Sequence, residues 1–149
     1  MVAALTAAFV LSSPVFGAHR PIPRRFTCDG ANVSPPLHWK APPRGTKAFA
    51  LFVIDIDAGP FAHWTLWDLP SSSRGVPAGT SWSRQGTNSF GRIGYAGPCP
   101  PTGKHRYVFT LYAVRLRLGL PRGASPPQFT HALPTRVIAT ATITGTYRR

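Results

Sequence analysis

Apolar residues in this chain fall into short runs separated by Gly, Pro and Ser. Helix signals are scarce, because glutamate is absent and proline recurs too often to leave room for amphipathic helices of three turns. The best helical candidate is residues 126–133, opened by Ser125 as a plausible N-cap before Pro126. Four runs have the β-branched and aromatic composition of strands: AFALFVIDID (48–57), HWTLWDL (63–69), RYVFTLYAVRLRL (106–118) and RVIATATITGTY (136–147).

The spacing of these runs predicts an all-β sandwich with one or two short helices. Proline-rich connections such as NVSPPLHWKAPPRG are typical of loops between sheets, so a parallel sheet with crossover helices is disfavoured. A length of 149 residues fits one domain, and the chain shows no internal repeat, low-complexity segment or linker. We therefore expect a single domain over residues 1–149.

The first 18 residues carry no charge. A signal peptide is poorly supported, because no Lys or Arg precedes Arg20 and no A-x-A cleavage site follows the short apolar run. A membrane span is also disfavoured, because Ser12, Ser13 and Pro14 interrupt the run. We expect a short tail leading into a first strand and a cytoplasmic protein, with export as the alternative if this stretch is the remnant of a leader.

The chain is strongly basic, with 17 Lys and Arg against four Asp, no Glu and a formal net charge of +13. Such an excess raises the affinity for polyanions, including an anionic membrane surface that the protein could contact peripherally. The basic residues are dispersed, however, and the longest runs are pairs of arginines. This pattern favours a solvated basic surface over specific nucleic-acid binding.

Two cysteines, Cys28 and Cys99, are present without a CxxC or a neighbouring histidine at zinc spacing. No metal site is therefore expected. The two residues could be buried thiols or the halves of one disulfide bond, and the sequence does not choose between these states.

Two of the four carboxylates, Asp55 and Asp57, end an otherwise apolar strand. The period of two predicts that they share one face, where they could cap a turn or line a pocket. A hairpin through AGPFA would bring His63 beside them, and a nearby carboxylate would then raise the pKa of the imidazole. A structural histidine with a satisfied hydrogen bond is the plainer alternative.

The stretch GPCPPTGKHRY (97–107) places polar residues directly after a rigid turn. Its prolines and glycines exclude regular structure from Gly97 to Gly103. In the strand that follows, His105 and Tyr107 share a face, whereas Arg106 points the other way and should pair with a carboxylate or carbonyl. Together with backbone N–H groups of the turn, two histidines and a tyrosine hydroxyl suit a phosphate or carboxylate ligand.

Catalysis has weak support. Cys99 and His105 are separated by a turn that need not bring them together, and no serine lies in a GxSxG elbow. Asp55 and His63 could belong to a triad, but nothing selects the serine. We therefore expect a protein that is not an enzyme and needs no cofactor.

The order of several stretches resembles the phosphatidylethanolamine-binding protein family, in its bacterial and archaeal Raf-kinase-inhibitor-like branch. These stretches span roughly residues 9–149: IPRRFTCDGANVSPPLHW, DIDA, HWTLWDLP, NSFGRIGYAGPCPPTGKHRY and a terminal GTY. The resemblance implies a two-sheet antiparallel β-sandwich with a small anion-binding pocket at one end. Members bind phosphate-like groups, including phospholipid headgroups, and some inhibit kinases or serine proteases.

Carried over by motif, the implied ligand-binding residues are Asp55, His63, Gly97, His105 and Tyr107, and the implied pocket frame is Asp57, Pro98 and Arg106. The chain departs from the family where the usual DPDAP reads DIDAG, so the pocket rim should differ. We expect a binding or regulatory module for a small anion such as a phosphate, a carboxylate or a phospholipid headgroup. The alternative is a protein inhibitor of a kinase or serine protease that acts through the loops around the pocket.

Overall fold

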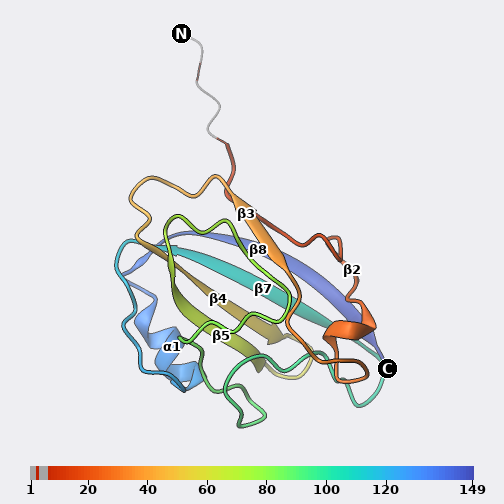
Figure 1. The fold of residues 1–149 in the computed structure, drawn as a ribbon. Helices are drawn as coiled ribbons and strands as arrows, with labels where there is room; N and C mark the ends of the chain where they lie inside the picture. The colour runs from red at the N-terminus through yellow and green to blue at the C-terminus, as the bar shows by residue number, and fades with distance from the viewer. Residues whose placement is uncertain (1–2, 4–6) are drawn as a thin grey trace.

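The computed structural model describes residue 3 and residues 7–149, and it contains two β-sheets and one short α-helix (Figure 1). The larger sheet has five strands in the order β2-β8-β7-β4-β5, and the smaller has three in the order β1-β3-β6. Their bounds are β1 Val10–Ser12, β2 Arg20–Pro21, β3 Leu37–Lys40, β4 Ala48–Asp55, β5 Phe61–Pro70, β6 Gly75–Val76, β7 Lys104–Val114 and β8 Val137–Arg148.

The expected two-sheet sandwich is confirmed, and all four predicted strands are present. The long strands β5, β4, β7 and β8 pair antiparallel with their neighbours, whereas the two-residue β2 pairs with β8 in parallel. Four strand bounds differ from the prediction by two residues or more: β4 stops at Asp55, β5 begins at Phe61, and β7 begins at Lys104 and stops at Val114. The earlier end of β4 matters for the site described below.

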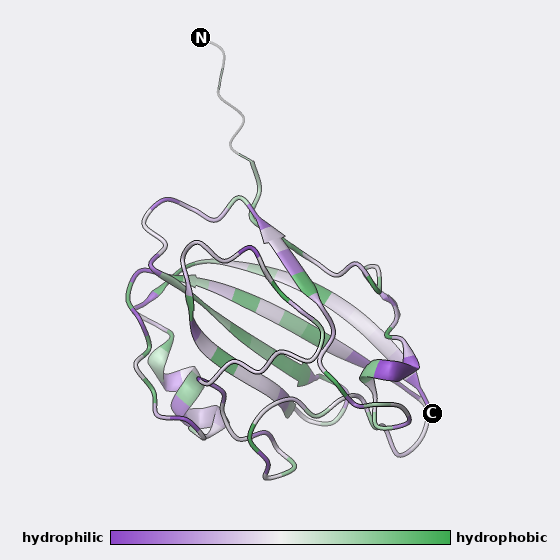
Figure 2. Ribbon diagram, in the orientation of Figure 1, coloured by the Kyte–Doolittle hydropathy of each residue, from purple (hydrophilic) through white to green (hydrophobic). Residues whose placement is uncertain are grey.

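Two hydrophobic clusters lie on the two faces of the larger sheet. The inner cluster fills the space between the sheets and includes Trp39, Phe49, Trp64 and Phe109. The outer cluster packs beneath α1, with Trp67 and Phe129 as its largest members. Figure 2 shows the resulting bands of hydrophobic and polar positions along β7. Burial of both faces explains why β4 reads as a nearly continuous apolar run.

The helix α1, Pro126–Ala132, forms where the sequence predicted it. The Ser125 hydroxyl accepts a hydrogen bond from the Gln128 N–H at 3.2 Å, and the Gln128 side chain accepts one from the Ser125 N–H at 2.8 Å. This reciprocal capping box satisfies two N–H groups at the helix start. A 3-10 turn, Arg24–Phe26, is the second short helical element.

The N-terminal tail lies partly outside the described residues, which exclude 1–2 and 4–6. Residues Val10–Ser12 form the first strand, as the sequence predicted. Within the described part of the chain, no helix is long and apolar enough to cross a membrane.

Candidate functional site

A cavity of about 260 Å³ opens at the end of the larger sheet where β4 finishes and where β5 and β7 begin. Antiparallel pairing brings these three strand ends together, since Asp55 on β4 lies opposite both Phe61 and Tyr107. The irregular loop 97–103, between the two glycines of the predicted turn, closes another side. The cavity is lined by Asp55, Ala58, Phe61, His63, Phe90, Cys99, Pro100, Pro101 and His105.

Asp55 and His105 form a hydrogen-bonded carboxylate–imidazole pair where β4 ends. The Asp55 Oδ2 atom lies 2.6 Å from Nδ1 of His105, and its Oδ1 atom accepts the N–H of Asp57 at 2.9 Å. The Asp55 side chain is 4% exposed and that of His105 17%. A carboxylate only accepts hydrogen bonds, so Nδ1 of His105 carries a proton. Its Nε2 atom makes no hydrogen bond to any described residue and is left for a ligand.

His63 reaches the same cavity because of a β-bulge in β5. In the register with β4, Ala62 lies opposite Ile54 and Trp64 lies opposite Val53, so His63 is the extra residue. Both His63 and Trp64 are therefore buried on the inner side of the sheet, His63 in the cavity and Trp64 in the core. The sequence places His63 near the end of β4 correctly, but period-two alternation does not predict this bulge.

The prediction that His63 pairs with a carboxylate is wrong. Its Nδ1 atom donates to the carbonyl oxygen of Ala96 at 2.6 Å, and Asp55 pairs with His105 instead. Burial lowers the pKa of His63 below its usual 6.5, although the Ala96 carbonyl and the Asp55 carboxylate oppose this effect. His63 is thus a neutral imidazole near pH 7, with a proton on Nδ1 and a lone pair on Nε2, and not the cation that the sequence suggested.

Asp57 and Arg106 form an ion pair outside the cavity. Arg106 donates to Asp57 through its backbone N–H at 2.8 Å and through Nε and Nη2 at 3.1 and 2.8 Å. This pairing lowers the pKa of Asp57 to about 2. Arg106 has the carboxylate partner that the alternation of β7 predicted. The prediction that Asp55 and Asp57 share one face is wrong, however, because β4 ends at Asp55 and the chain turns before Asp57.

Tyr107 lies beneath the cavity and does not line it. Its ring packs edge-on against His63, with 5.3 Å between ring centroids, and the residue is 1% exposed. Burial, together with the nearby Asp55 carboxylate, raises the pKa of its hydroxyl. Among the described residues, that hydroxyl has no hydrogen-bond partner. His105 and Tyr107 therefore lie on one face of β7, as predicted, but only His105 lines the cavity and Tyr107 lies behind it.

Gly97 and Pro98 hold the loop in place. The Gly97 N–H donates to the side-chain oxygen of Asn32 at 2.8 Å, so it is already occupied and faces away from any anion in the cavity. A β-carbon at Gly97 would lie 2.3 Å from the carbonyl oxygen of Phe26, which explains the glycine. The Pro98 carbonyl accepts the N–H of Cys28 at 3.1 Å. Sequence reasoning missed Asn32, whose role depends on a contact 65 residues away.

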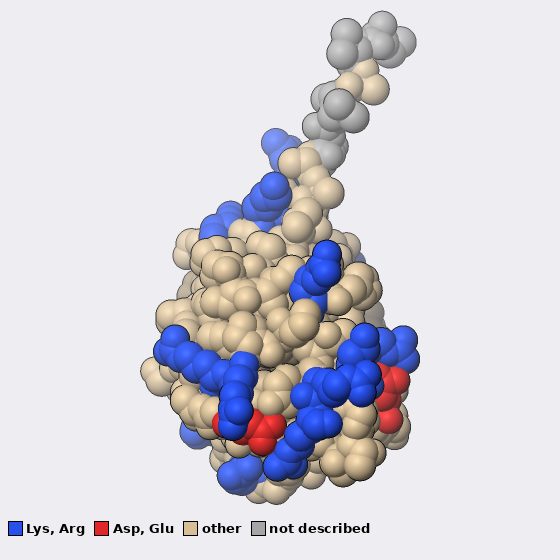
Figure 3. Space-filling model, turned by 90° about the vertical axis from the view of Figure 1, so that its right-hand side faces the viewer, with Lys and Arg blue, Asp and Glu red and all other residues tan. Residues whose placement is uncertain are grey.

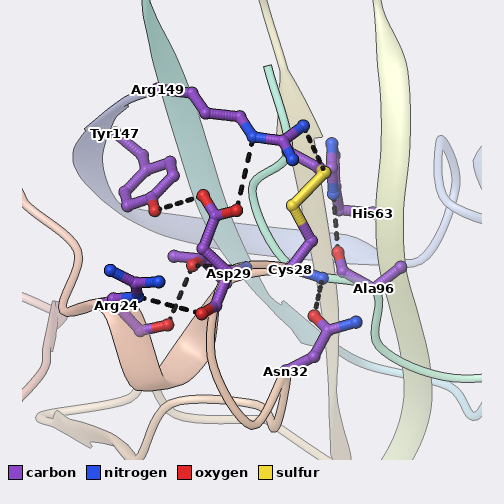
Figure 4. The surroundings of a disulfide bond; sticks show 11 residues. Arg24, Cys28, Asp29, Asn32, His63, Ala96, Tyr147 and Arg149 are labelled. Carbon is purple, nitrogen blue, oxygen red and sulfur yellow. Dashed lines mark hydrogen bonds and ion pairs between the residues drawn. A yellow bond between two sulfur atoms is a disulfide. The ribbon is translucent and has the colours of Figure 1, made fainter. Parts of the chain in front are cut away.

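Cys28 and Cys99 form a disulfide bond, which settles the two states that the sequence left open (Figure 4). Asp29, next to Cys28, accepts from the Tyr147 hydroxyl at 2.6 Å and pairs with Arg149 at 3.3 Å. The Arg149 guanidinium also lies 3.6 Å from the sulfur of Cys99. The disulfide therefore ties the cavity wall both to the 3-10 turn region and to the end of β8.

Apolar side chains form much of the cavity wall, and sequence reasoning did not assign them to the site. Phe61 and Phe90 pack edge-on with 4.7 Å between their ring centroids, and Phe90 also approaches His63 at 5.6 Å. Phe61 could have been found, because period two places it on the side of His63. Phe90 comes from a long irregular segment, where no periodicity points to the cavity.

Metal binding has no support in the described residues, since no group of three His, Cys, Asp or Glu side chains could hold an ion there. The cavity itself contains one carboxylate and two imidazoles with different partners. What this arrangement offers is a small, mostly apolar chamber into which two Nε2 atoms can present either a lone pair or a proton.

Comparison with known proteins gave consistent matches over nearly the whole chain. The family model described as phosphatidylethanolamine-binding protein matches residues 12–148. A UPF0098 protein of Aquifex aeolicus is 44% identical over 86% of this chain and 81% of its own length. A UPF0098 protein of Methanothermobacter thermautotrophicus is 40% identical over 93% of this chain and 98% of its own length.

Two crystal structures have the same architecture. The protein CT736 of Chlamydia trachomatis has a TM-score of 0.90 at 37% identity, covering 95% of this chain and 98% of that one. The structure of Escherichia coli YbcL, described as a new member of the mammalian PEBP family, has a TM-score of 0.88 at 28% identity, covering 96% and 99%.

Proposed function

This chain belongs to the phosphatidylethanolamine-binding protein family, and from that premise we propose that its cavity binds a small anion, such as inorganic phosphate or the phosphate of a lipid headgroup. The observation that carries the proposal is the pair of imidazoles in one cavity. His63 and His105 are each fixed through Nδ1, by Ala96 and Asp55 respectively, so their Nε2 atoms remain for a ligand. Covalent catalysis by a hydroxyl or thiol nucleophile is disfavoured, because none of the lining residues is a Ser, a Thr or a free Cys.

The two rings have different tasks in this proposal. In this proposal Nε2 of His105 donates a hydrogen bond to an anionic oxygen, while its Nδ1 stays bound to the Asp55 carboxylate. His63 is neutral in the empty protein and takes up a proton when an anion enters, because the ligand charge then compensates the cost of burial. The walls formed by Phe61, Phe90 and the two prolines are apolar and offer a bound anion no competing hydrogen-bond partners.

The surface around this end of the protein is basic. Figure 3 shows Lys and Arg spread over the face that contains the C-terminus, with only two groups of acidic atoms in view. Lys104, Arg148 and Arg149 lie near the loop that closes the cavity, and Arg149 donates its backbone N–H to the Gly103 carbonyl. A formal charge of +13 attracts anions over a Debye length and speeds their entry at low salt.

Isothermal titration with inorganic phosphate and with phosphoethanolamine tests the proposal. We expect both to bind the native protein, and we expect the double variant His63→Gln, His105→Gln to lose about a hundredfold in affinity, as two charge-assisted hydrogen bonds are removed. His131→Gln is the matched control, since this histidine lies on α1 away from the cavity lining. Equal affinity in the native protein and the double variant would overturn the proposal.

The pH dependence follows from the lowered pKa of His63. Anion binding needs the protonated ring, so affinity should rise as the pH falls toward the lowered pKa of the folded protein and level off below it. Sulfate is the suitable probe, because it remains a dianion from pH 5 to 8 and only the protein titrates. A flat affinity profile for sulfate would assign binding to backbone donors instead.

A protein-inhibitor role is the second candidate, favoured by one observation. Phe90 and Ile93 are large apolar side chains that are 45% and 47% exposed, and Phe90 lines the cavity. Loops carrying such residues can dock onto a kinase or a protease. Inhibition of a captured enzyme should then survive the double histidine variant and be lost in the Phe90→Ser, Ile93→Ser variant.

We propose that the protein is exported and acts outside the cytoplasm. The disulfide is typical of oxidising compartments, whereas a cytoplasmic location was expected. One Mycobacterium tuberculosis relative, 41% identical over 92% of this chain, carries the name "Putative lipoprotein LppC". Fractionation of the native host, with an antibody against this chain, distinguishes the two locations.

A further inference from the structure

The disulfide is the last of several links that hold the cavity wall. The Tyr95 hydroxyl donates to the Phe26 carbonyl at 2.6 Å, Gly97 donates to Asn32, and Cys28 donates to Pro98. On the other side, the Ala96 N–H donates to the His63 carbonyl at 3.0 Å. Residues 95–98 are therefore fixed from both sides even without the disulfide.

Between Pro98 and Gly103, the disulfide is the link that holds the cavity wall. In the described chain, residues 100–102 make no hydrogen bond through their backbone, and the next link is the Arg149 N–H to the Gly103 carbonyl at 3.3 Å. Pro100 and Pro101 nevertheless line the cavity. The covalent bond at Cys99 thus fixes the start of a four-residue span, 99–102, that would otherwise be held only through its ends at Pro98 and Gly103.

The two sulfurs differ in their surroundings. Cys99 lines the cavity and has the Arg149 guanidinium 3.6 Å from its sulfur, whereas Cys28 is absent from the lining. A small thiol that enters the cavity therefore meets Cys99 first. A negatively charged thiol is favoured, because the basic surface attracts it and because Arg149, paired with Asp29 through Nε, still directs Nη1 at the Cys99 sulfur.

We propose that the Cys28–Cys99 disulfide is a thiol-exchange site reached through the cavity, at which a small anionic thiol attacks Cys99 and opens the cavity wall. The incoming thiolate forms a bond to the Cys99 sulfur, the bond to Cys28 breaks, and Cys28 leaves as a thiolate that takes a proton. A second thiol then attacks the external sulfur and releases Cys99. Two external thiols become one external disulfide and supply the two electrons that reduce the protein.

Trapping the mixed disulfide tests which sulfur is attacked. The oxidised protein is treated with glutathione, quenched with iodoacetamide and digested for mass spectrometry. We expect glutathione on Cys99 and the alkyl group on Cys28; the reverse assignment would overturn the proposal. Arg149→Gln should slow exchange with glutathione about fivefold and leave exchange with the cationic thiol cysteamine unslowed. An equal rate of glutathione exchange in both proteins would also count against it.

Hydrogen exchange tests the opening of the wall without any ligand. Reduction should increase amide exchange at Arg149, whose N–H donates to the Gly103 carbonyl, by at least tenfold, while the amides of Ala96 and Gly97 stay protected by the links described above. Cys28→Ser, Cys99→Ser is the control, because it should show the open pattern with or without reductant. Unchanged exchange at Arg149 on reduction would overturn this part.

The effect on binding rests on the proposed function. Reduced protein should bind phosphate about tenfold more weakly than oxidised protein, because ordering the free span then costs conformational entropy. Absence of phosphate binding in the oxidised protein would overturn the proposed function and leave the wall to be judged by hydrogen exchange. Equal binding by both forms, where the oxidised form does bind, would overturn the coupling between the disulfide and the site.

Discussion

Two acid–base pairs lie two residues apart at the same turn, and they differ in almost every physical respect. Asp55 pairs with His105, with side chains 4% and 17% exposed, whereas Asp57 pairs with Arg106, with side chains 28% and 56% exposed. Both carboxylates accept a backbone N–H as well. What separates them is the end of β4, since Asp55 is its last residue and Asp57 lies beyond it.

The comparison teaches that the burial of a carboxylate decides how much it contributes to stability and to the orientation of its partner. A charge that is removed from water must be compensated by its neighbours, so Asp55 fixes the tautomer and orientation of His105. An exposed pair is screened by solvent and salt. The pair of Asp57 and Arg106 therefore orients the turn more than it adds to the free energy of unfolding. The buried pair belongs to the binding cavity, and the exposed pair holds the turn beside it.

The sharpest way to break the comparison is to remove each carboxylate separately. Asp55→Ala should lower the free energy of unfolding by about 2 kcal/mol, because it leaves a partly buried imidazole N–H and the Asp57 N–H without an acceptor. Urea denaturation followed by tryptophan fluorescence measures the change. Asp57→Ala is the matched control, and its effect should be clearly smaller.

Equal destabilisation by the two substitutions would contradict the assignment of the buried pair as the stronger one. Asp55→Asn refines the result, because an amide can still accept the Asp57 N–H through its oxygen while it loses the charge. We expect Asp55→Asn to fall between the native protein and Asp55→Ala in stability.

A second test uses the histidine that has no carboxylate partner. In the unfolded chain His63 titrates with its usual pKa of 6.5, and in the folded protein its pKa is lower. Between these values the unfolded state binds more protons, so the free energy of unfolding should fall as the pH falls below 6.5 and level off below the folded pKa. His63→Gln keeps a donor for the Ala96 carbonyl and removes the titration.

The measurement is the free energy of unfolding from pH 7.5 to 5 in both proteins. We expect the native protein to lose up to about 1.4 kcal/mol more per pH unit than His63→Gln within this window, which corresponds to one proton. Parallel pH profiles would mean that His63 titrates alike in both states, and the distinction from the carboxylate-bound His105 would lose its basis.

Much of the fold and of the site could be predicted from the sequence. Strand runs, the capped helix after Ser125 and the hairpin that brings His63 to the end of β4 all follow from local patterns. The opposite orientations of His105 and Arg106 follow from alternation along β7. The three features that did not follow are the partner of His63, the separation of Asp55 from Asp57, and the occupied N–H of Gly97.

Each of these depends on something that a local pattern does not contain. The bulge at His63 arises from a mismatch between two strands, and the hydrogen bond from Gly97 to Asn32 joins residues far apart in the chain. The fate of Asp57 depends on where β4 stops, and strand ends are the least predictable part of an element. Motif resemblance gathered the residues around the cavity, but only coordinates separate those that line it from those that support it.

The smallest expected effect concerns the exposed pair. Asp57 has a pKa of about 2 in the folded protein and 3.8 in the unfolded chain. Its contribution to stability is fully present above pH 3.8 and is lost as the pH falls through about 2, because the unfolded state binds the extra proton in this window. Asp57→Asn should therefore flatten the acid limb of the stability profile between pH 4 and 2.

Acid unfolding curves in low salt, followed by tryptophan fluorescence, provide the comparison. Arg106→Gln is the control that removes the partner and keeps the carboxylate, and it should produce nearly the same flattening. Adding 1 M NaCl should reduce the difference between the native protein and both variants, since the pair is open to solvent and to screening. An acid limb in Asp57→Asn that matches the native protein would mean that the exposed pair contributes geometry alone, which would widen its contrast with Asp55 and His105.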